Sequence, residues 1–167
     1  MSKPKREKQH NTITNNKKHN IMKTDNYTTA KNFVQGYEAN ANNLRTDGII
    51  LVSYYTVIGL RAEYKNTNFA NVLFLCRAGY SNTTRKHKSH VYSNAYRYGY
   101  KVIELDTVRP YNDNDHAKNL KGFEEAAREY RTKAERARTD RNKAVYMEQA
   151  KREEENERIY KAVYKLA

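Results

Sequence analysis

The sequence has little of what several protein classes need. It holds one cysteine, Cys76, so an internal disulfide is excluded, and its apolar surroundings (Val72–Cys76) predict a buried, inert thiol. No apolar run approaches the roughly 18 residues of a membrane span. The N-terminus also lacks the apolar segment of a secretory signal. These absences favour a protein of the cytoplasm, with no membrane partner.

Recognisable sites for metals, cofactors and catalysis are also absent. The six glycines form no phosphate-binding motif. His87 and His90 have a spacing that suits one edge of a metal site, but they lie among Arg85, Lys86 and Lys88, which would repel a cation. Serine and histidine occur without the contexts of a catalytic triad. We therefore expect no metal, no cofactor and no catalytic centre.

Positive charge is the dominant property of the chain. Its 167 residues carry a formal net charge of +13, which divides into +5 for residues 1–25, +4 for residues 26–116 and +4 for residues 117–167. A charge of this size implies a polyanionic partner, either DNA, RNA or an acidic protein surface.

The order of patterns predicts an α+β fold in three parts. Residues 1–25 are basic and poor in apolar residues, which predicts a disordered arm, and Met22 offers a second translation start that would make the arm dispensable. Residues 26–110 predict a small domain in which one helix packs across an antiparallel sheet of three or four strands. Residues 117–167 predict a long charged helical extension.

The expected strands are rich in β-branched and aromatic residues. The run Ile49–Tyr64 is too long for one strand, so we expect a bend near Ser53–Thr56 or at Gly59. A turn at Asp47-Gly48 precedes it, and residues 65–70 predict the loop after it. Further strands are expected at residues 71–76 and 101–106.

Two helices are expected in the domain. A helix from about Thr84 to Tyr98 follows N-capping residues and ends at Gly99; on it His87, Val91, Ala95 and Tyr98 form the face expected to pack on the sheet. A short earlier helix, capped by Thr28 or Thr29, would place Phe33, Val34 and Tyr37 on one side.

The C-terminal segment predicts one long helix, or two. A seam with alternating spacings of three and four consists of Leu120, Phe123, Ala127, Tyr130, Ala134, Ala137, Arg141 and Ala144. Such a seam is typical of a coiled coil, although its alanines bury little area. Two interpretations stay open: a homodimer through this helix, or a helix that folds back on its own domain.

The best candidate for a binding surface is the stretch Tyr80–Lys101, which contains no acid. Cations that attract phosphate and aromatic rings that stack on bases are the usual means of binding nucleic acid without reading its sequence. The residues predicted to bind DNA or RNA are Arg85, Lys86, Lys88, Tyr92, Tyr96, Arg97 and Lys101. In the alternative interpretation the tyrosines fill the core and the cations form a solvated face.

Two short motifs, taken in their order along the chain, resemble those of a known domain. Ser53-Tyr54-Tyr55-Thr56, followed by Tyr80-Ser81-Asn82-Thr83-Thr84-Arg85-Lys86-His87, resembles a small domain of bacteriophage and mobile-element accessory proteins. The similarity spans about residues 48–106. Members of this group are mostly of unknown function, and small phage proteins of this kind include anti-CRISPR inhibitors. The resemblance thus implies phage takeover or evasion of host defence.

Two binding mechanisms and one enzymatic alternative follow. The protein is expected either to bind DNA or RNA directly, in phage replication or gene regulation, or to dock as an inhibitor on a host nucleoprotein effector complex. The segment Gly79–His87 also faintly resembles the GIY-YIG nucleases. That family requires a paired tyrosine motif upstream and a metal-binding glutamate, and Gly36-Tyr37 and Glu104 are poorly placed for these roles.

Overall fold

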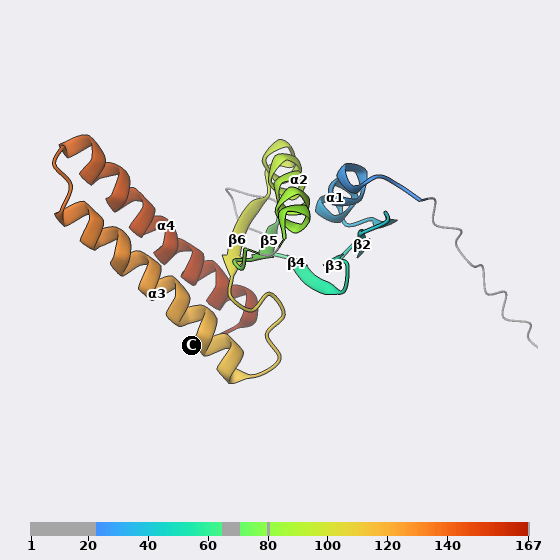
Figure 1. The fold of residues 1–167 in the computed structure, drawn as a ribbon. Coiled ribbons are helices and arrows are strands. Elements are labelled where there is room, and N and C mark those ends of the chain that lie inside the picture. Colours follow the sequence, from blue (N-terminus) through green and yellow to red (C-terminus); the bar gives the residue numbers. More distant parts are fainter. Residues whose placement is uncertain (1–22, 65–70, 80, 167) are drawn as a thin grey trace, which may run out of the picture.

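The computed structural model describes residues 23–64, 71–79 and 81–166 (Figure 1). The predicted loop at 65–70 and all but the last three residues of the predicted arm at 1–25 lie outside this range. In chain order, the elements are α1 (Asn26–Gln35), β1 (Glu38–Asn40), β2 (Leu44–Asp47), β3 (Ile50–Ser53), β4 (Thr56–Ala62), β5 (Val72–Cys76), α2 (Asn82–Tyr98), β6 (Lys101–Leu105), α3 (Asp113–Glu135) and α4 (Asp140–Tyr164).

The sheet is larger than the sequence predicts and is mixed. Within the described residues it has six strands in the order β1-β2-β3-β4-β5-β6, so the prediction of three or four strands is wrong. Strands β1 to β5 pair antiparallel, whereas β6 runs parallel to β5. The parallel pair arises because α2 carries the chain back across the sheet before β6 begins. A helical crossover of this kind returns the next strand in the same direction.

The predicted strands at 49–64 are confirmed with one turn between them. The chain reverses at Tyr54, whose φ of 55° lies in the left-handed region, and β3 pairs with β4 around this turn. The Asp47-Gly48 turn is also confirmed. Asp47 Oδ1 accepts hydrogen bonds from the N–H groups of Ile49 and Ile50, and Gly48 has a φ of 89°. A Cβ on Gly48 would lie 2.5 Å from the Gly36 carbonyl oxygen, so the turn needs glycine.

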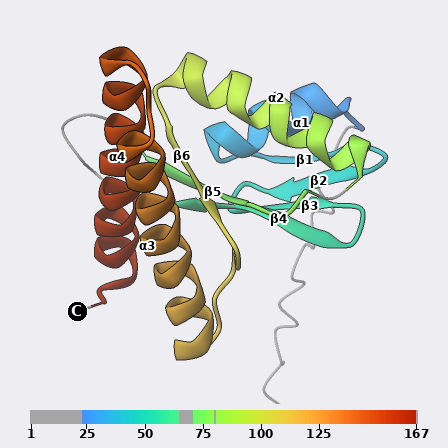
Figure 2. The ribbon, with the colours of Figure 1, turned by 60° about the vertical axis from the view of Figure 1, so that its left-hand side comes forward.

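Helices cover the sheet from two sides (Figure 2). Leu75 of β5 lies opposite Gly59 of β4 and Glu104 of β6, so these three residues share one face of the sheet. A Cβ on Gly59 would meet the Phe33 ring of α1, and α1 and α2 both lie over this face (Figure 2). Because side chains alternate along a strand, Phe74 points to the other face. There its ring packs on Tyr160 and Tyr164 of α4.

The helices of the domain begin close to where the sequence predicts. The helix expected at 84–98 is α2, which starts at Asn82 because Ser81 accepts a hydrogen bond from the Thr84 N–H. Helix α1 is also present, but its N-cap is Asp25 rather than a threonine. Tyr37 lies beyond its end and is exposed. Cys76 is buried, as predicted, and burial raises the pKa of its thiol.

The C-terminal extension is a hairpin of two helices, one of the two alternatives the pattern left open. The chain reverses at residues 136–139, where Thr139 caps the start of α4. The predicted seam is buried or half-buried from Leu120 to Ala137 and packs on α4 of the same chain, whereas Arg141 and Ala144 lie past the reversal and are exposed. A homodimer through this region stays a prediction, and it would need a face other than the seam.

One apolar core runs through both parts of the molecule. It joins Phe33 and Val91 on one face of the sheet to Phe123 and Tyr160 of the hairpin. The core therefore crosses the predicted boundary near Pro110. Among the described residues, no helix combines the length and the apolar character that crossing a membrane requires.

Candidate nucleic-acid interface

Four of the seven predicted binding residues lie on the outer face of α2. Arg85, Lys86, Tyr96 and Arg97 are exposed, and Tyr96 is 91% exposed. Arg85 and Tyr96 are separated by eleven residues, as are Lys86 and Arg97, which is about three helical turns and places each pair in one row. None of the three cations forms an ion pair with an acid in the described residues. This outer face is thus free to meet a ligand.

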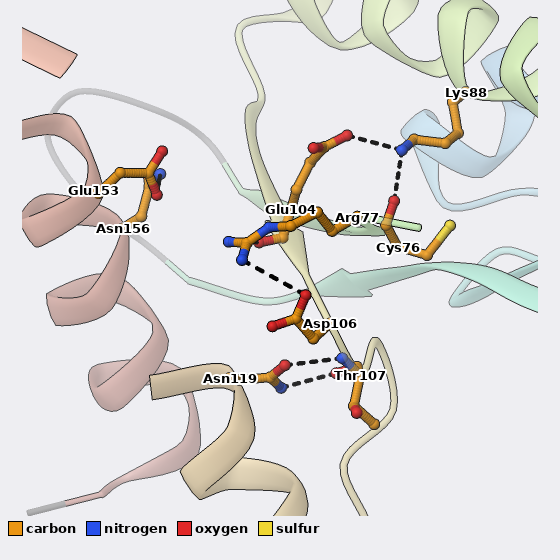
Figure 3. Close-up of polar contacts among 9 residues, drawn as sticks. All are labelled: Cys76, Arg77, Lys88, Glu104, Asp106, Thr107, Asn119, Glu153 and Asn156. Atoms are coloured by element: carbon orange, nitrogen blue, oxygen red, sulfur yellow. Dashed lines mark hydrogen bonds and ion pairs between the residues drawn. The ribbon is translucent and has the colours of Figure 1, made fainter. Parts of the chain in front are cut away.

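The other three predicted residues lie next to other elements, and Figure 3 shows Lys88 between Glu104 and Cys76. Lys88 Nζ lies 2.8 Å from Glu104 Oε1 on β6 and donates a hydrogen bond to the Cys76 carbonyl oxygen. The Tyr92 hydroxyl donates to the same Glu104 oxygen at 2.7 Å, and burial together with this contact raises the pKa of Tyr92. Lys101 is half-buried; burial, followed by the positive charge of Arg152, lowers its pKa. Lys88 and Lys101 are thus less available to phosphate than their sequence positions suggest, whereas Tyr92 has its hydroxyl bonded but stays 40% exposed.

A polar cleft lies beside these residues, between α2, β6 and the helical hairpin. Its volume is about 660 Å³, and five carboxylates and two guanidinium groups line it. At its centre Arg77 Nη1 lies 3.5 Å from Asp106 Oδ1, and Arg77 Nη2 donates to the Glu104 carbonyl oxygen (Figure 3). Asn156 lines it as well; it is 6% exposed and its Oδ1 has no partner among the described residues. The excess of carboxylates disfavours phosphate in this cleft.

Sequence reasoning missed this cleft because its lining comes from four elements and from the residues that follow β5 and β6. Arg77 follows β5 and Asp106 follows β6; Val102 and Glu104 lie on β6, and the remaining residues come from α2 and from both helices of the hairpin. One local signal was present: Gly122 is a glycine in the interior of a long helix. A Cβ there would lie 2.7 Å from Asp106 Oδ2, which marks a close approach of α3 to the end of β6.

Three residues of the two motifs that resemble a phage domain, Ser53, Thr84 and His87, meet in a buried polar cluster. Ser53 Oγ lies 2.9 Å from His87 Nδ1 and 3.3 Å from Thr84 Oγ1, and Ser81 caps the same helix. Ser53 and His87 are 2% and 1% exposed, so a substrate has no access to this serine–histidine pair. Burial, with a smaller contribution from His90, lowers the pKa of His87 and keeps the imidazole neutral. The cluster ties the β3–β4 turn to the start of α2.

His90 does not join His87 in a metal site. The His90 ring makes an edge contact with Tyr27 of α1, with 5.6 Å between the ring centroids. Within the described residues, no group of three or more His, Cys, Asp or Glu side chains is placed to hold a metal ion.

Comparison with family models, with curated proteins and with solved structures found no match to this chain.

Proposed function

We propose that this protein is a non-enzymatic nucleic-acid-binding protein whose contact surface is the outer face of α2. The observation that carries the proposal is the composition of that face: three unpaired cations, Arg85, Lys86 and Arg97, beside the almost fully exposed ring of Tyr96. No acid occurs anywhere in α2. The face therefore has a field of one sign, which attracts phosphate wherever it lies along the helix.

The chemistry of this face suits a backbone contact rather than sequence reading. Lysine and arginine release counterions from phosphates, and this sequence-independent effect dominates affinity. An exposed tyrosine adds stacking on a base, worth about 1–3 kcal/mol per base in single-stranded nucleic acid. Arg85 also ends the first turn of α2 and Lys86 follows it, near the helix end where the dipole adds positive potential.

The test is a salt series of binding titrations with labelled 24-nucleotide single-stranded and 24-base-pair double-stranded DNA and RNA. In the triple variant Arg85→Gln/Lys86→Gln/Arg97→Gln, we expect affinity to fall at least about ten-fold near 150 mM salt. The slope of log K against log salt on duplex should become shallower by about 2.7, because each lost phosphate contact removes about 0.9. Tyr96→Ala should weaken single-stranded binding more than duplex binding.

A matched control removes the same charge elsewhere. Lys23→Gln/Arg45→Gln/Arg109→Gln changes three exposed cations that lie off α2, so affinity should change little. Equal losses in the two triple variants would contradict a contact on α2. If the wild-type protein binds bare nucleic acid only at the level of any cationic protein, with a Kd of about 10⁻⁴ to 10⁻⁶ M, direct binding is overturned. That outcome would favour docking on a host nucleoprotein complex, as an anti-CRISPR-type inhibitor does.

A further inference from the structure

The positive charge of the helical hairpin is concentrated at its tip. Residues 128–143 hold seven Lys/Arg and three acids, whereas the rest of 117–167 holds equal numbers of both. The whole +4 of the C-terminal segment therefore belongs to the ends of α3 and α4 that meet at the reversal. We call residues 128–143 the hairpin tip.

Most of these cations are unpaired. Arg131 pairs with Glu154 and Lys133 with Glu129. The remaining five are exposed and have no ion pair with an acid in the described residues; they are Arg128, Arg136, Arg138, Arg141 and Lys143. Like charges this close repel one another, so their placement costs stability unless an anion binds there.

Packing does not explain the composition of the tip. Its seam residues are the half-buried Tyr130, two alanines (Ala134 and Ala137) and the exposed Arg141, and the first turns of α4 leave Ala144 and Val145 exposed. The large apolar contacts of the hairpin, Phe123 and Tyr160, lie near the sheet instead. The tip is thus an extension that buries little apolar area and carries a net positive charge.

The tip reaches well beyond the sheet on the same side as α2. Gly122 lies against Asp106 at the end of β6, and fourteen residues of helix separate it from Arg136, a rise of roughly 20 Å. Both ribbon views show the reversal between α3 and α4 on the side of the sheet that α1 and α2 cover (Figures 1 and 2). The outer face of α2 and the tip therefore lie on one side of the molecule.

From this arrangement we propose that the hairpin tip is a second phosphate-binding surface, which contacts the same nucleic acid as the outer face of α2. The inference rests on the proposed function. The acidic cleft between α2 and the hairpin repels phosphate, so the ligand spans from α2 to the tip without filling the cleft. Because duplex DNA carries one charge per about 1.7 Å, the roughly 20 Å by which the tip extends past the end of β6 corresponds to about 12 phosphates, or about 6 base pairs. Binding by the tip should therefore depend on ligand length.

The test compares duplex DNA of 6 and 24 base pairs in the full-length protein. The tip variant is Arg136→Gln/Arg138→Gln/Arg141→Gln/Lys143→Gln, and all four side chains are exposed, so circular dichroism should be unchanged. On 24 base pairs we expect about a ten-fold loss of affinity near 150 mM salt and a slope shallower by about 3.6. A 6-base-pair duplex carries only about the 12 phosphates of that 20 Å length, too few to cover the outer face of α2 as well, so on it the tip variant should lose much less affinity than on 24 base pairs.

The matched control carries the same change in net charge below the tip. Lys118→Gln/Lys121→Gln/Lys151→Gln/Lys165→Gln replaces four exposed lysines of the same hairpin and should leave both affinities nearly unchanged. Equal losses in the tip and control variants would reduce the effect to net charge and overturn the inference. So would a tip variant that binds 24 base pairs like the wild type. In that case a loss in the α2 triple variant still supports the proposed function, whereas no loss in either variant means that both proposals fail.

Discussion

Ser53 and His87 show how a buried polar pair can explain a sequence motif. Burying an imidazole costs free energy unless its ring nitrogens form hydrogen bonds that replace those to water. In this cluster Ser53 Oγ lies 2.9 Å from His87 Nδ1. His87 Nε2 has no partner among the described residues, so a second proton on the ring would be poorly solvated there. The serine and histidine of the motif are therefore accounted for by burial, with no catalytic role required.

The lowered pKa of His87 predicts acid sensitivity. In the unfolded chain His87 regains its ordinary pKa of 6.5, so below that pH the unfolded state binds more protons than the folded state. The free energy of unfolding should fall as the pH drops from 7 to 5. Asp25 and Asp47 have lowered pKa values because backbone N–H groups bond their carboxylates. Their contribution is lost only when the pH falls through about 3.8 and below.

Urea unfolding at pH 7, 6 and 5 measures this dependence. His87→Gln, which keeps an amide that can bond Ser53, should flatten the pH dependence between pH 7 and 5. His90→Gln is the control, because the His90 ring is only half-buried, and it should keep most of the slope. An unchanged slope in His87→Gln would show that other groups cause the acid sensitivity.

At the scale of elements, α4 is fixed to the sheet by two tyrosines with different surroundings. The Tyr160 hydroxyl accepts a hydrogen bond from Asn119 Nδ2 at 3.0 Å and lies 2.8 Å from His116 Nδ1. The Tyr164 hydroxyl is buried with no partner among the described residues, and burial raises its pKa to about 12. Both rings pack on Phe74.

These surroundings predict opposite effects for the same substitution. Tyr160→Phe removes one of the two hydrogen bonds that Asn119 Nδ2 donates, leaving only the bond to the Thr107 carbonyl oxygen, and should lower the free energy of unfolding by about 1–3 kcal/mol. Tyr164→Phe removes a buried hydroxyl that bonds nothing described and keeps the ring, so stability should stay the same or rise. Urea denaturation of the two variants measures the contrast. Equal destabilisation would mean that the hydroxyl environments do not differ in this way.

The elements also differ in how well sequence predicts them. Strands β3 to β5 are dense in β-branched and aromatic residues, and α2 has a serine cap and a terminal glycine, so local patterns suffice. Strands β1 and β2 are three and four residues long and mostly polar, and pairing of β1 with β2 and of β2 with β3 stabilises them rather than their own propensity. The reversal at 136–139 contains neither glycine nor proline; its one local signal is Thr139-Asp140, a helix start.

The candidate site, too, could be predicted from the sequence only in part. Helical periodicity identifies the packing face of α2, of which His87, Val91 and Ala95 are buried, and Arg85, Lys86, Tyr96 and Arg97 lie off it and are exposed. It could not reveal that Lys88 and Tyr92 contact Glu104, since that contact depends on β6 lying beside β5 after a crossover. The charge of the tip is visible in the sequence, but its place on the side of α2 follows only from the folded hairpin.

At the scale of the molecule, the hairpin completes the core of the sheet. Phe74, Ile103 and Leu105 are almost fully buried and share one cluster with Phe123 and Tyr160. The segment up to Pro110 thus lacks the helices that cover one of its apolar faces.

This continuity predicts that a chain ending at Pro110 does not fold alone. We expect it to lose cooperative urea unfolding and to bind a hydrophobic dye such as ANS, because the Phe74 face is bare. A chain that begins at Met22 is the control and should unfold cooperatively, since it keeps every described contact. Cooperative unfolding of the shortened chain, with no dye binding, would show that residues 26–110 are an independent domain.

The order of the strands has a consequence for folding during synthesis. Strand order in the sheet is strand order in the chain, so each strand from β2 to β5 can pair with the one that left the ribosome just before it. The sheet face that carries Phe74 is covered only after α4 has been synthesised. At about 5–20 residues per second, the 88 residues from Cys76 to Tyr164 take roughly 4 to 18 seconds to emerge. For that interval the nascent chain displays an apolar patch, the kind of surface that chaperones bind.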